Sequence, residues 1–546
     1  MNLNACDFSC DLVIVGGGLA ALSAAISAAD DGATVLVVNK GVTGNSGSSA
    51  KAAGILAAPF GHGDLKNRPV LDTPNKHAQD TLRVGHHIGD TKLVHFVAQK
   101  AISAIEWLGS LGIEFSRASD GGYVQLNAPG NSCPRAVSAL GGGKAMISAL
   151  IHQAKKRSVM ILDETIARDI TLTKNQRFLV TLQANQMASV TASALVLAAG
   201  GATGLFPTVS GDEGNIGTSL MLGYNVGVAL KNLEFVEFTL IYRVRSQTLR
   251  VAGMAPFLSR GGKLTNRHGK DLFESHFPNI PAEQTGRAEI LRAVEHEIVN
   301  DRGPVHLDCA HFSNTIWEEF ESSQGSTILN QLANAGCDYR NEKIEVIPAA
   351  HSVLAGIEID TDAQTKIPGI FAAGENATGI HGAGRLSGNG LTACVVMGRV
   401  AGKNASDYAK KIKMSNQNLG SKKNLDTKLL SQLRPTNKEQ SDYFSGSPSI
   451  QELMAKVRKI VGDNLGIIRN GLSLTEAKNQ LDSLWSEVEY LDEQKKDIFE
   501  LQQMVRLARL MVDAAERRKE SRGVQFRSDF DVPDDSWVKP QTLLKN

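Results

Sequence analysis

The sequence lacks the cysteine pattern of a metalloprotein. Its 546 residues contain only six cysteines, and no pair of closely spaced CxxC motifs that would hold zinc or an iron–sulfur cluster. Cys6 and Cys10 are near enough in sequence to bind one metal ion together, but they precede the first predicted strand and no further ligands stand beside them. We therefore expect no metal site and interpret the six as reduced, mostly structural thiols: Cys6, Cys10, Cys133, Cys309, Cys337 and Cys394.

An excess of one charge and long apolar runs are also missing. Lysine and arginine number 58 against 57 aspartates and glutamates, so the chain presents no net field to nucleic acid or to an anionic membrane. No apolar run approaches the length of a membrane span. The first ten residues, MNLNACDFSC, have neither the basic nor the apolar region of a signal peptide. We therefore expect a cytoplasmic protein without a nucleic-acid partner or a membrane span, divided into roughly two to four domains.

A glycine-rich turn follows the first predicted strand. Residues 11–22 read DLVIVGGGLAAL, and small residues at helical spacing come next. In this strand–turn–helix pattern Gly16 makes the turn, Gly18 lets a pyrophosphate approach the backbone, and Ala21 lets the helix pack closely on the strand. The helix N-terminus then faces the phosphates with the positive end of its dipole. Such a turn also occurs at ordinary βα junctions, but its position at the start of the chain favours dinucleotide binding.

Three later segments refine the identity of the dinucleotide. The second predicted strand, TVLVVNK, ends in Asn39 and Lys40 where NAD enzymes place an acidic residue, and Asn39 can still hydrogen-bond a ribose or an adenine. The pattern therefore favours FAD over NAD. Two further strand-to-glycine junctions, at residues 194–204 and 367–379, suit one long cofactor that lies across a sheet.

The segment HGAGRLSGNG, residues 381–390, packs four glycines around one arginine and one histidine. Glycine allows close approach of the backbone to a ligand or a positive φ. Arg385 offers a planar fork that suits a carboxylate or a phosphate. The segment is therefore typical of a binding site for an anion.

These segments resemble the flavoprotein family of fumarate reductase, succinate dehydrogenase and L-aspartate oxidase, nearly end to end. The resemblance implies an α/β fold: an FAD-binding Rossmann-like domain with an inserted α+β capping domain and a C-terminal helical domain. Besides the opening turn and AAGG at residues 198–201, the blocks that carry the resemblance are SSAKAAGILAA (48–58), GRAEILRAVEHEI (286–298), VIPAAHSVLAGIEID (346–360), FAAGENATGIHGAGRLSGNGL (371–391) and ARLMVDAAERRKESRG (508–523).

The resemblance implies roles for individual residues. Arg287 matches the arginine that acts as acid and base at the substrate carbon, His351 the histidine that binds a substrate carboxylate, and Arg385 the arginine that clamps it. Glu375 matches the glutamate that binds ribityl or ribose hydroxyls. The residues themselves leave simpler alternatives open: a solvated helix face for Arg287, a core histidine for His351 and a surface loop for Glu375. The full set of expected cofactor residues is Gly16, Gly18, Ala21, Asn39, Lys40, Ser48, Gly54, Gly200, Gly201, Glu375, Gly388, Asn389 and Leu391, with Gly388 and Gly390 expected to let flavin and substrate come close.

Departures from the family pattern bear on the substrate. Thr239 stands where dicarboxylate enzymes of the family have a histidine, Pro256 and Phe257 stand near their Thr-Glu pair, and Ala128 falls near the glutamate of the aspartate oxidases. We therefore predict a substrate with one carboxylate beside an apolar wall, and not succinate, fumarate or aspartate. Ser48 replaces the histidine that binds FAD covalently, so we predict non-covalent FAD.

The predicted organisation is a split FAD domain of residues 1–230 and 345–405, a capping domain of residues 231–344, a linker at residues 406–448 and a helical domain of residues 449–546. We predict hydride transfer between FAD and a carbon next to a carboxylate-bearing centre of a small substrate, as desaturation or alkene reduction. Two alternatives remain open: an amino-acid or amine oxidase of the L-aspartate oxidase type, and a flavoprotein subunit that passes electrons to a partner protein. Nothing in the sequence fixes the oligomeric state.

Overall fold

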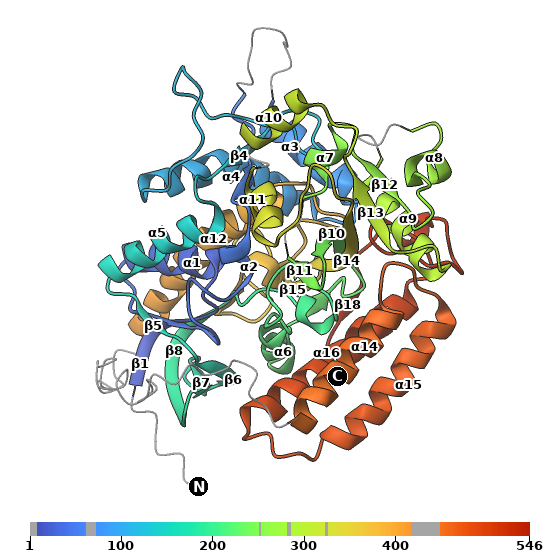
Figure 1. Ribbon diagram of the computed structural model, residues 1–546. Coiled ribbons are helices and arrows are strands. Elements are labelled where there is room, and N and C mark those ends of the chain that lie inside the picture. Colours follow the sequence, from blue (N-terminus) through green and yellow to red (C-terminus); the bar gives the residue numbers. More distant parts are fainter. Residues whose placement is uncertain are drawn as a thin grey trace.

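A mostly parallel sheet forms the base of the cofactor-binding part of the molecule (Figure 1). The computed structural model describes residues 8–61, 72–250, 253–280, 285–322, 326–415 and 448–545. The sheet order is β5-β2-β1-β8-β7-β6, with the short β16 beside the end of β8; β6 and β7 are antiparallel to their neighbours and the rest are parallel. Its strands are β1 (Phe8–Val15), β2 (Val35–Val38), β5 (Met160–Leu162), β6 (Ile166–Leu172), β7 (Phe178–Gln183), β8 (Met187–Leu197) and β16 (Ile370–Ala372).

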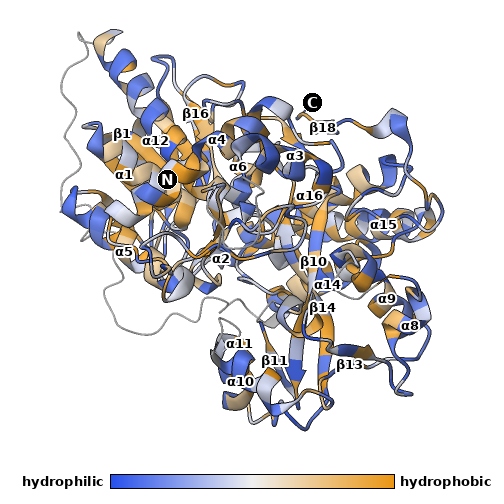
Figure 2. Ribbon diagram, turned by 90° about the horizontal axis from the view of Figure 1, so that it is seen from above, coloured by the Kyte–Doolittle hydropathy of each residue, from blue (hydrophilic) through white to orange (hydrophobic). Residues whose placement is uncertain are grey.

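Two helices pack against each other beside the central strands. They are α1 (Leu19–Asp30) and α12 (Asn389–Ser415), and α1 is coloured largely as apolar in Figure 2. Gly398 and Gly402 of α12 allow the close approach, because a Cβ at either position would clash with backbone of α1. The strands they cover read as near-continuous apolar runs because the sheet is buried on both faces.

Several shorter elements surround this sheet. The segment after α1 contains α2 (Ser48–Lys51), β3 (Ile55–Ala57), α3 (Pro74–Val84), α4 (Thr91–Ser110), β4 (Ala136–Ser138) and α5 (Gly142–Lys156). After β8 come the 3₁₀ turn η1 (Thr203–Leu205) and α6 (Thr218–Asn225), and after β16 comes η3 (Gly374–Asn376). No helix among the described residues is long and apolar enough to cross a membrane.

A five-stranded sheet, in the order β11-β10-β14-β13-β12, forms a second part that projects from the first in Figure 2. Its strands are β10 (Val236–Val244), β11 (Gln247–Leu249), β12 (Lys263–Thr265), β13 (Val305–Asp308) and β14 (Ile344–Val353). Its helices are α7 (Ala255–Leu258), α8 (Leu272–His276), α9 (Arg287–Val299), α10 (Asn314–Ser322) and α11 (Ser326–Asn334). The segment GGKLTNRHGKDLF resembles a hairpin in sequence, but its strand β12 pairs with β13. Within the segment a single bridge, between Thr265 and Asp271, closes the turn.

Phe257 belongs to the core of this second part. Its side chain is fully buried, and its ring packs edge-on against Phe320 and Tyr242, with centroids 4.7 and 6.0 Å away. The expectation that Phe257 walls the substrate site is therefore wrong: aromatic packing within this second part of the molecule holds the side chain instead.

Three helices form the C-terminal part, side by side in Figure 1: α14 (Pro448–Asn464), α15 (Gly471–Val488) and α16 (Lys496–Arg517). The tail after α16 contains η4 (Asp535–Trp537) and β18 (Thr542–Leu543). β18 completes a four-stranded sheet, β17-β15-β9-β18, with β9 (Leu230–Lys231), β15 (Gly356–Glu358) and β17 (Ala377–Thr378). A buried ion pair of 2.7 Å joins Arg518, directly after α16, to Glu234, which lies between β9 and β10. It links the C-terminal part to the rest of the chain.

The predicted linker begins too early in the chain. Helix α12 continues to Ser415, so residues 406–415 are helical. Of these residues, Ala409 and Ile412 are buried and continue the apolar stripe of the helix, which the polar residues between them hide in the sequence. The rest of the predicted linker up to residue 447 lies outside the described residues, as does Cys6, whereas Cys10 is buried in β1.

Candidate active site

Three glycine-containing loops meet at one edge of the parallel sheet. They follow β1, β8 and β16, whose carboxyl ends lie next to one another. Gly16 has a φ of +120°, and a Cβ there would clash with the carbonyl of Ala198 in the second loop. Gly201 of that loop lies against the carboxylate of Glu375 in the third, and a Cβ at Gly374 would lie 2.8 Å from Cβ of Ala20. The structure therefore brings the three predicted junctions together at one edge.

The residues at this edge fit a bound dinucleotide. Helix α1 begins at Leu19 behind Gly18, which has no side chain to cap the helix, and the backbone N–H of Leu19 donates to the hydroxyl of Ser49 at 3.2 Å. The positive end of the helix dipole at this terminus suits an anion. Asn376 of η3 is fully buried, yet neither its Nδ2 nor its Oδ1 has a hydrogen-bond partner within the described ranges. Because buried amides in native proteins are nearly always paired, these two atoms point to a polar group that belongs here.

The side chains at the end of β2 are engaged by protein groups. Nδ2 of Asn39 donates to the carbonyl of Gly41 and to the hydroxyl of Thr43, both at 3.0 Å. Nζ of Lys40 lies 2.9 Å from a carboxylate oxygen of Glu500 and so links the cofactor part to α16. The cofactor-binding roles of Asn39 and Lys40 stay predictions, while the contacts seen for both are structural.

The start of α12 is also tied to protein. Oδ1 of Asn389 lies 2.6 Å from Nε2 of His77, and Nδ2 of Asn389 donates to the hydroxyl of Thr81 at 2.8 Å. Gly388 has a φ of +88°, and a Cβ there would lie 2.8 Å from Cβ of Ala57. These contacts fix α12 on α3 and β3.

The other predicted cofactor residues lie in ordinary local settings. The hydroxyl of Ser48 accepts a hydrogen bond of 2.9 Å from Nδ2 of Asn215, which also lies near Gly200. Gly54 and Gly200 have φ values of +81° and +82°, Ala21 is buried in α1, and Leu391 is partly buried. Their roles toward FAD stay predictions.

Glu237 joins two of the three predicted catalytic residues. Its Oε2 accepts hydrogen bonds from Nε and Nη2 of Arg385 at 3.1 and 2.7 Å, and its Oε1 lies 3.1 Å from Nη1 of Arg287. The carboxylate is 5% exposed, against 14% for the side chain of Arg385 and 37% for that of Arg287. Arg287 is thus paired at the first turn of α9, which contradicts its alternative as a purely solvated residue.

A β-bulge places the third predicted residue, His351. Glu237 of β10 pairs with Ser352 of β14, but the next residue, Phe238, pairs with Ala350, so His351 is the extra residue of β14. Bulges re-aim side chains at functional sites. Nδ1 of His351 lies 2.7 Å from the hydroxyl of Ser210, on a segment that runs beside β14.

Glycines let the loop of Arg385 fit between its neighbours. A Cβ at Gly382 would clash with the carbonyl of Gly85, and one at Gly390 would lie 2.7 Å from Nη1 of Arg385. The carbonyl of Ala383 accepts a hydrogen bond of 2.9 Å from the backbone of Val524, in the C-terminal tail. The close approaches that the structure shows for Gly388 and Gly390 are thus to protein, in addition to any that they make to flavin or substrate.

The electrostatics of the site follow from burial and from the two arginines. Burial lowers the pKa of His351 and of His381 to about 3, and Arg385 adds to both shifts, so both imidazoles are neutral at pH 7. Burial alone would raise the pKa of Glu237, but Arg385 and Arg287 outweigh it and lower that pKa to about 2. Burial raises the pKa of Glu375, whose Oε1 accepts a hydrogen bond of 3.0 Å from the backbone of Val353.

Two family models match this chain. Residues 11–391 match the model described as FAD binding domain, and residues 454–546 match the fumarate reductase flavoprotein C-terminal model. The chain belongs to the flavoprotein family of fumarate reductase and L-aspartate oxidase. It is therefore an FAD-dependent oxidoreductase, as the sequence predicted, and FAD is the group that the glycine loops fit.

Relatives of this flavoprotein match over nearly their whole length. An uncharacterized FAD-dependent oxidoreductase of Methanocaldococcus jannaschii is 30% identical, with 96% of this chain and 95% of the relative covered. A subunit of the CoM/CoB fumarate reductase of Methanothermobacter marburgensis is 28% identical, with coverages of 97% and 96%. The L-aspartate oxidase of Streptomyces coelicolor is 28% identical, with coverages of 98% and 91%.

Solved structures confirm the predicted fold of the flavoprotein. A variant of E. coli quinol fumarate reductase has a TM-score of 0.82 at 23% identity, with 98% of this chain and 96% of that chain covered. Sdh1 of Mycobacterium smegmatis has a TM-score of 0.79 at 26% identity, with coverages of 98% and 94%.

Sequence reasoning missed two residues of the flavoprotein's site, Glu237 and Ser210. Glu237 was detectable as a lone carboxylate within the apolar run VEFTLIYRV of β10, where a buried charge needs a partner. Ser210 gave no comparable signal, because a serine between two turns is common. Thr239 lies two residues beyond Glu237 on the same strand and is buried.

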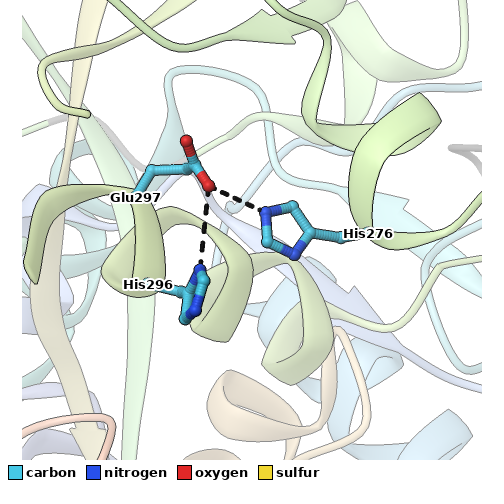
Figure 3. A group of neighbouring side chains, drawn as sticks. All are labelled: His276, His296 and Glu297. Atoms are coloured by element: carbon cyan, nitrogen blue, oxygen red, sulfur yellow. Dashed lines mark hydrogen bonds and ion pairs between the residues drawn. The ribbon is translucent and has the colours of Figure 1, made fainter. Parts of the chain in front are cut away.

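A cluster on α8 and α9 has the composition of a metal site but not its charge (Figure 3). Oε1 of Glu297 lies 3.0 Å from Nε2 of His276 and 3.7 Å from Nδ1 of His296. Arg302 donates to both oxygens of the same carboxylate at 2.9 Å, and Asn266 donates to one of them at 2.8 Å. Because a guanidinium already neutralises Glu297, the cluster as arranged is a structural network between α8 and α9.

Proposed function

We propose that the protein transfers a hydride between FAD and a carbon next to a carboxylate-bearing centre, by desaturation or alkene reduction. The observation that supports this most is the pairing of Glu237 with both Arg287 of α9 and Arg385 of the loop before α12, beside the β-bulge that carries His351. That same loop follows η3, one of the cofactor junctions. Bound FAD accepts or donates the hydride; the chain binds and orients the substrate and moves the proton.

In this proposal Arg385 and His351 hold the substrate carboxylate. Arg385 is fixed by Glu237 before substrate arrives, so its remaining N–H groups are aimed in advance at negative charge that develops in the transition state. Neutral His351 contributes a hydrogen bond and no charge. When the Ser210 hydroxyl donates to Nδ1, the imidazole carries its proton on Nε2 and can donate it to a carboxylate.

Arg287 exchanges the proton at the neighbouring carbon, a role supported by the resemblance to the family. Its half-exposed side chain at the first turn of α9 is reachable from solvent, which suits repeated proton exchange. We expect Arg287→Ala to lose turnover and keep its FAD. Arg292→Ala is the matched control, since Arg292 lies on the same helix and pairs with Glu289. Turnover by Arg287→Ala at the rate of the control would exclude the role.

We further propose that FAD is bound without a covalent link. Ser48 starts α2 with its hydroxyl engaged by Asn215, and serine has no imidazole nitrogen to form such a link. After acid precipitation the flavin should stay in the supernatant. Flavin that remains with the precipitate would contradict this.

The other two functions are separated by their products and partners. Relatives named L-aspartate oxidase support an oxidase that forms an imine, for which the readout is hydrogen peroxide from an amino acid. The relative from Methanothermobacter marburgensis is named as one subunit of a fumarate reductase, which supports a flavoprotein that exchanges electrons with a partner protein. Purification from the native cell with an iron–sulfur protein bound would favour the latter.

A further inference from the structure

We infer that Glu237 determines the substrate charge that this site accepts: a single carboxylate is bound and a dicarboxylate is rejected. This inference rests on the proposed function, since it concerns the same arginines. The discrimination between one and two carboxylates is thereby assigned to Glu237, a residue for which the family resemblance implies no role.

Glu237 supplies a permanent negative charge between the two arginines. Each of its two oxygens is committed to a different guanidinium, Oε1 to Arg287 and Oε2 to Arg385. A substrate carboxylate therefore cannot bridge the two arginines at the position where Glu237 already does. Within the described part of the chain, Nη1 of Arg385 donates to no protein acceptor, so Arg385 keeps binding capacity for one substrate carboxylate.

The charges of the groups around Glu237 lead to the same conclusion. Arg287 and Arg385 bring two positive charges, Glu237 removes one, and neutral His351 and His381 add none. The site is therefore +1 when Glu375 is protonated and 0 when it is ionised. In both states a second substrate carboxylate has no positive partner and faces the carboxylate of Glu237, which disfavours dianions.

A second buried arginine cluster of the same chain shows what a purely structural arrangement looks like. Arg135 is fully buried and is bonded to both Asp72 and Asp80, at 2.8 and 2.6 Å, so two carboxylates surround one guanidinium. Around Glu237, in contrast, two guanidinium groups surround one carboxylate, and both arginines are partly exposed. The excess positive charge and its access distinguish the Glu237 group as a binding site.

The test compares fumarate with crotonate, which share a carbon skeleton but differ in one carboxylate against one methyl group. Affinities are measured without turnover, from the shift of the flavin absorption spectrum of the oxidised holoenzyme at neutral pH. Wild-type protein should bind crotonate at least tenfold more tightly than fumarate. In Glu237→Gln the ratio should move at least tenfold toward fumarate, because the amide keeps the shape and removes the charge.

Glu345→Gln is the control. It also removes one negative charge from the same sheet, but from the far end of β14, where Glu345 pairs with Arg243 at 2.8 Å. Its ratio should equal that of the wild type. Fumarate binding at least as tight as crotonate binding in the wild type would overturn the inference, and this comparison needs no variant to fold. An unchanged ratio in folded Glu237→Gln would overturn it as well. If neither ligand shifts the flavin spectrum in any of the three proteins, the carboxylate site and with it the proposed function fail.

Discussion

Arg385 donates two hydrogen bonds to one oxygen of Glu237, through Nε at 3.1 Å and Nη2 at 2.7 Å. This pairing fixes the plane of the guanidinium inside a loop whose glycines leave no room for other side chains. The arginine that the sequence singled out is thus oriented by a carboxylate on another strand before any ligand binds. Preorganised donors of this kind are what stabilise developing negative charge efficiently.

Arg385→Lys should keep the positive charge and lose the planar guanidinium group with its several fixed donors. A lysine ammonium cannot make both of these bonds to Glu237 and still present fixed donors to a substrate. We expect kcat/KM to fall by about 100-fold, or about 2.7 kcal/mol, with FAD content unchanged. Arg243→Lys, on the same strand as Glu237 and paired with Glu345, should change kcat/KM by less than about twofold. Equal effects of the two variants would contradict the role of Arg385.

Ser210→Ala should weaken the binding of the carboxylate by removing the group that sets the tautomer of His351. The lost hydrogen bond at Nδ1 is worth about 1 kcal/mol, so KM should rise about fivefold while kcat changes less. Ser210→Thr keeps a hydroxyl and should restore most of the affinity. If threonine fails to rescue and kcat falls instead of KM rising, Ser210 acts through packing and not through the imidazole.

Stability should fall in mild acid because three histidines are held neutral. In the folded protein burial lowers the pKa of His77 to about 4 and those of His351 and His381 to about 3. Well above pH 6.5, the ordinary pKa of histidine, both the folded and unfolded states are neutral at these positions, so the three histidines leave stability unchanged. Below it the unfolded chain takes up protons that the folded one does not, at a cost of about 1.4 kcal/mol per histidine by pH 5.5. Glu237 does not offset this loss, since its stabilising effect is constant above its ordinary pKa of 4.5.

Denaturant unfolding at several pH values measures this effect. The free energy of unfolding should change little between pH 8.5 and 7.5 and drop by about 3 kcal/mol between pH 6.5 and 5.5. His77→Gln keeps a donor for Asn389 and should lose about a third of that drop. A stability that is flat down to pH 5.5 would show that these imidazoles are not held neutral.

Gly523→Ala should disturb the active site from the C-terminal tail. Gly523 has a φ of +57°, and a Cβ there would clash with the carbonyl of Ala383, which accepts the hydrogen bond from Val524. Because this contact supports the loop of Arg385, we expect at least a tenfold loss of kcat/KM in a folded protein that retains FAD. Gly32→Ala is the control: its φ is +85°, but nothing lies within 4 Å of its Cβ. Similar kinetic losses in both variants would mean that backbone strain, and not the contact, is responsible.

Much of this arrangement was predictable because local sequence carries the constraint. The glycine junctions after β1, β8 and β16 need glycine for steric reasons, and their meeting at one edge follows from parallel strand pairing. The placement of Arg287 on a helix was also apparent from the periodicity of the segment that carries it, whereas its position at the helix start was not predicted.

The remainder depends on tertiary contacts that leave no local pattern. The bulge that makes His351 the extra residue of β14 arises from pairing with a strand more than a hundred residues earlier. Phe257 was assigned to the site by its place in the sequence, yet its ring is held by Phe320 and Tyr242. Lys40 follows a cofactor strand but meets Glu500 of the C-terminal helices. In each case the position of the side chain depends on residues that are far away in the sequence.

The central claim is hydride transfer next to a carboxylate held by Arg385, and one anaerobic experiment tests it most directly. The flavin of the holoenzyme is chemically reduced and then mixed with a panel of unsaturated acids: crotonate, branched and aromatic monocarboxylates, and fumarate. In parallel, the oxidised flavin is mixed with saturated acids and with aspartate. The account predicts that a monocarboxylate reoxidises the reduced flavin or bleaches the oxidised one, and that Arg287→Ala does neither. A flavin that responds to none of these acids in either redox state would contradict the account.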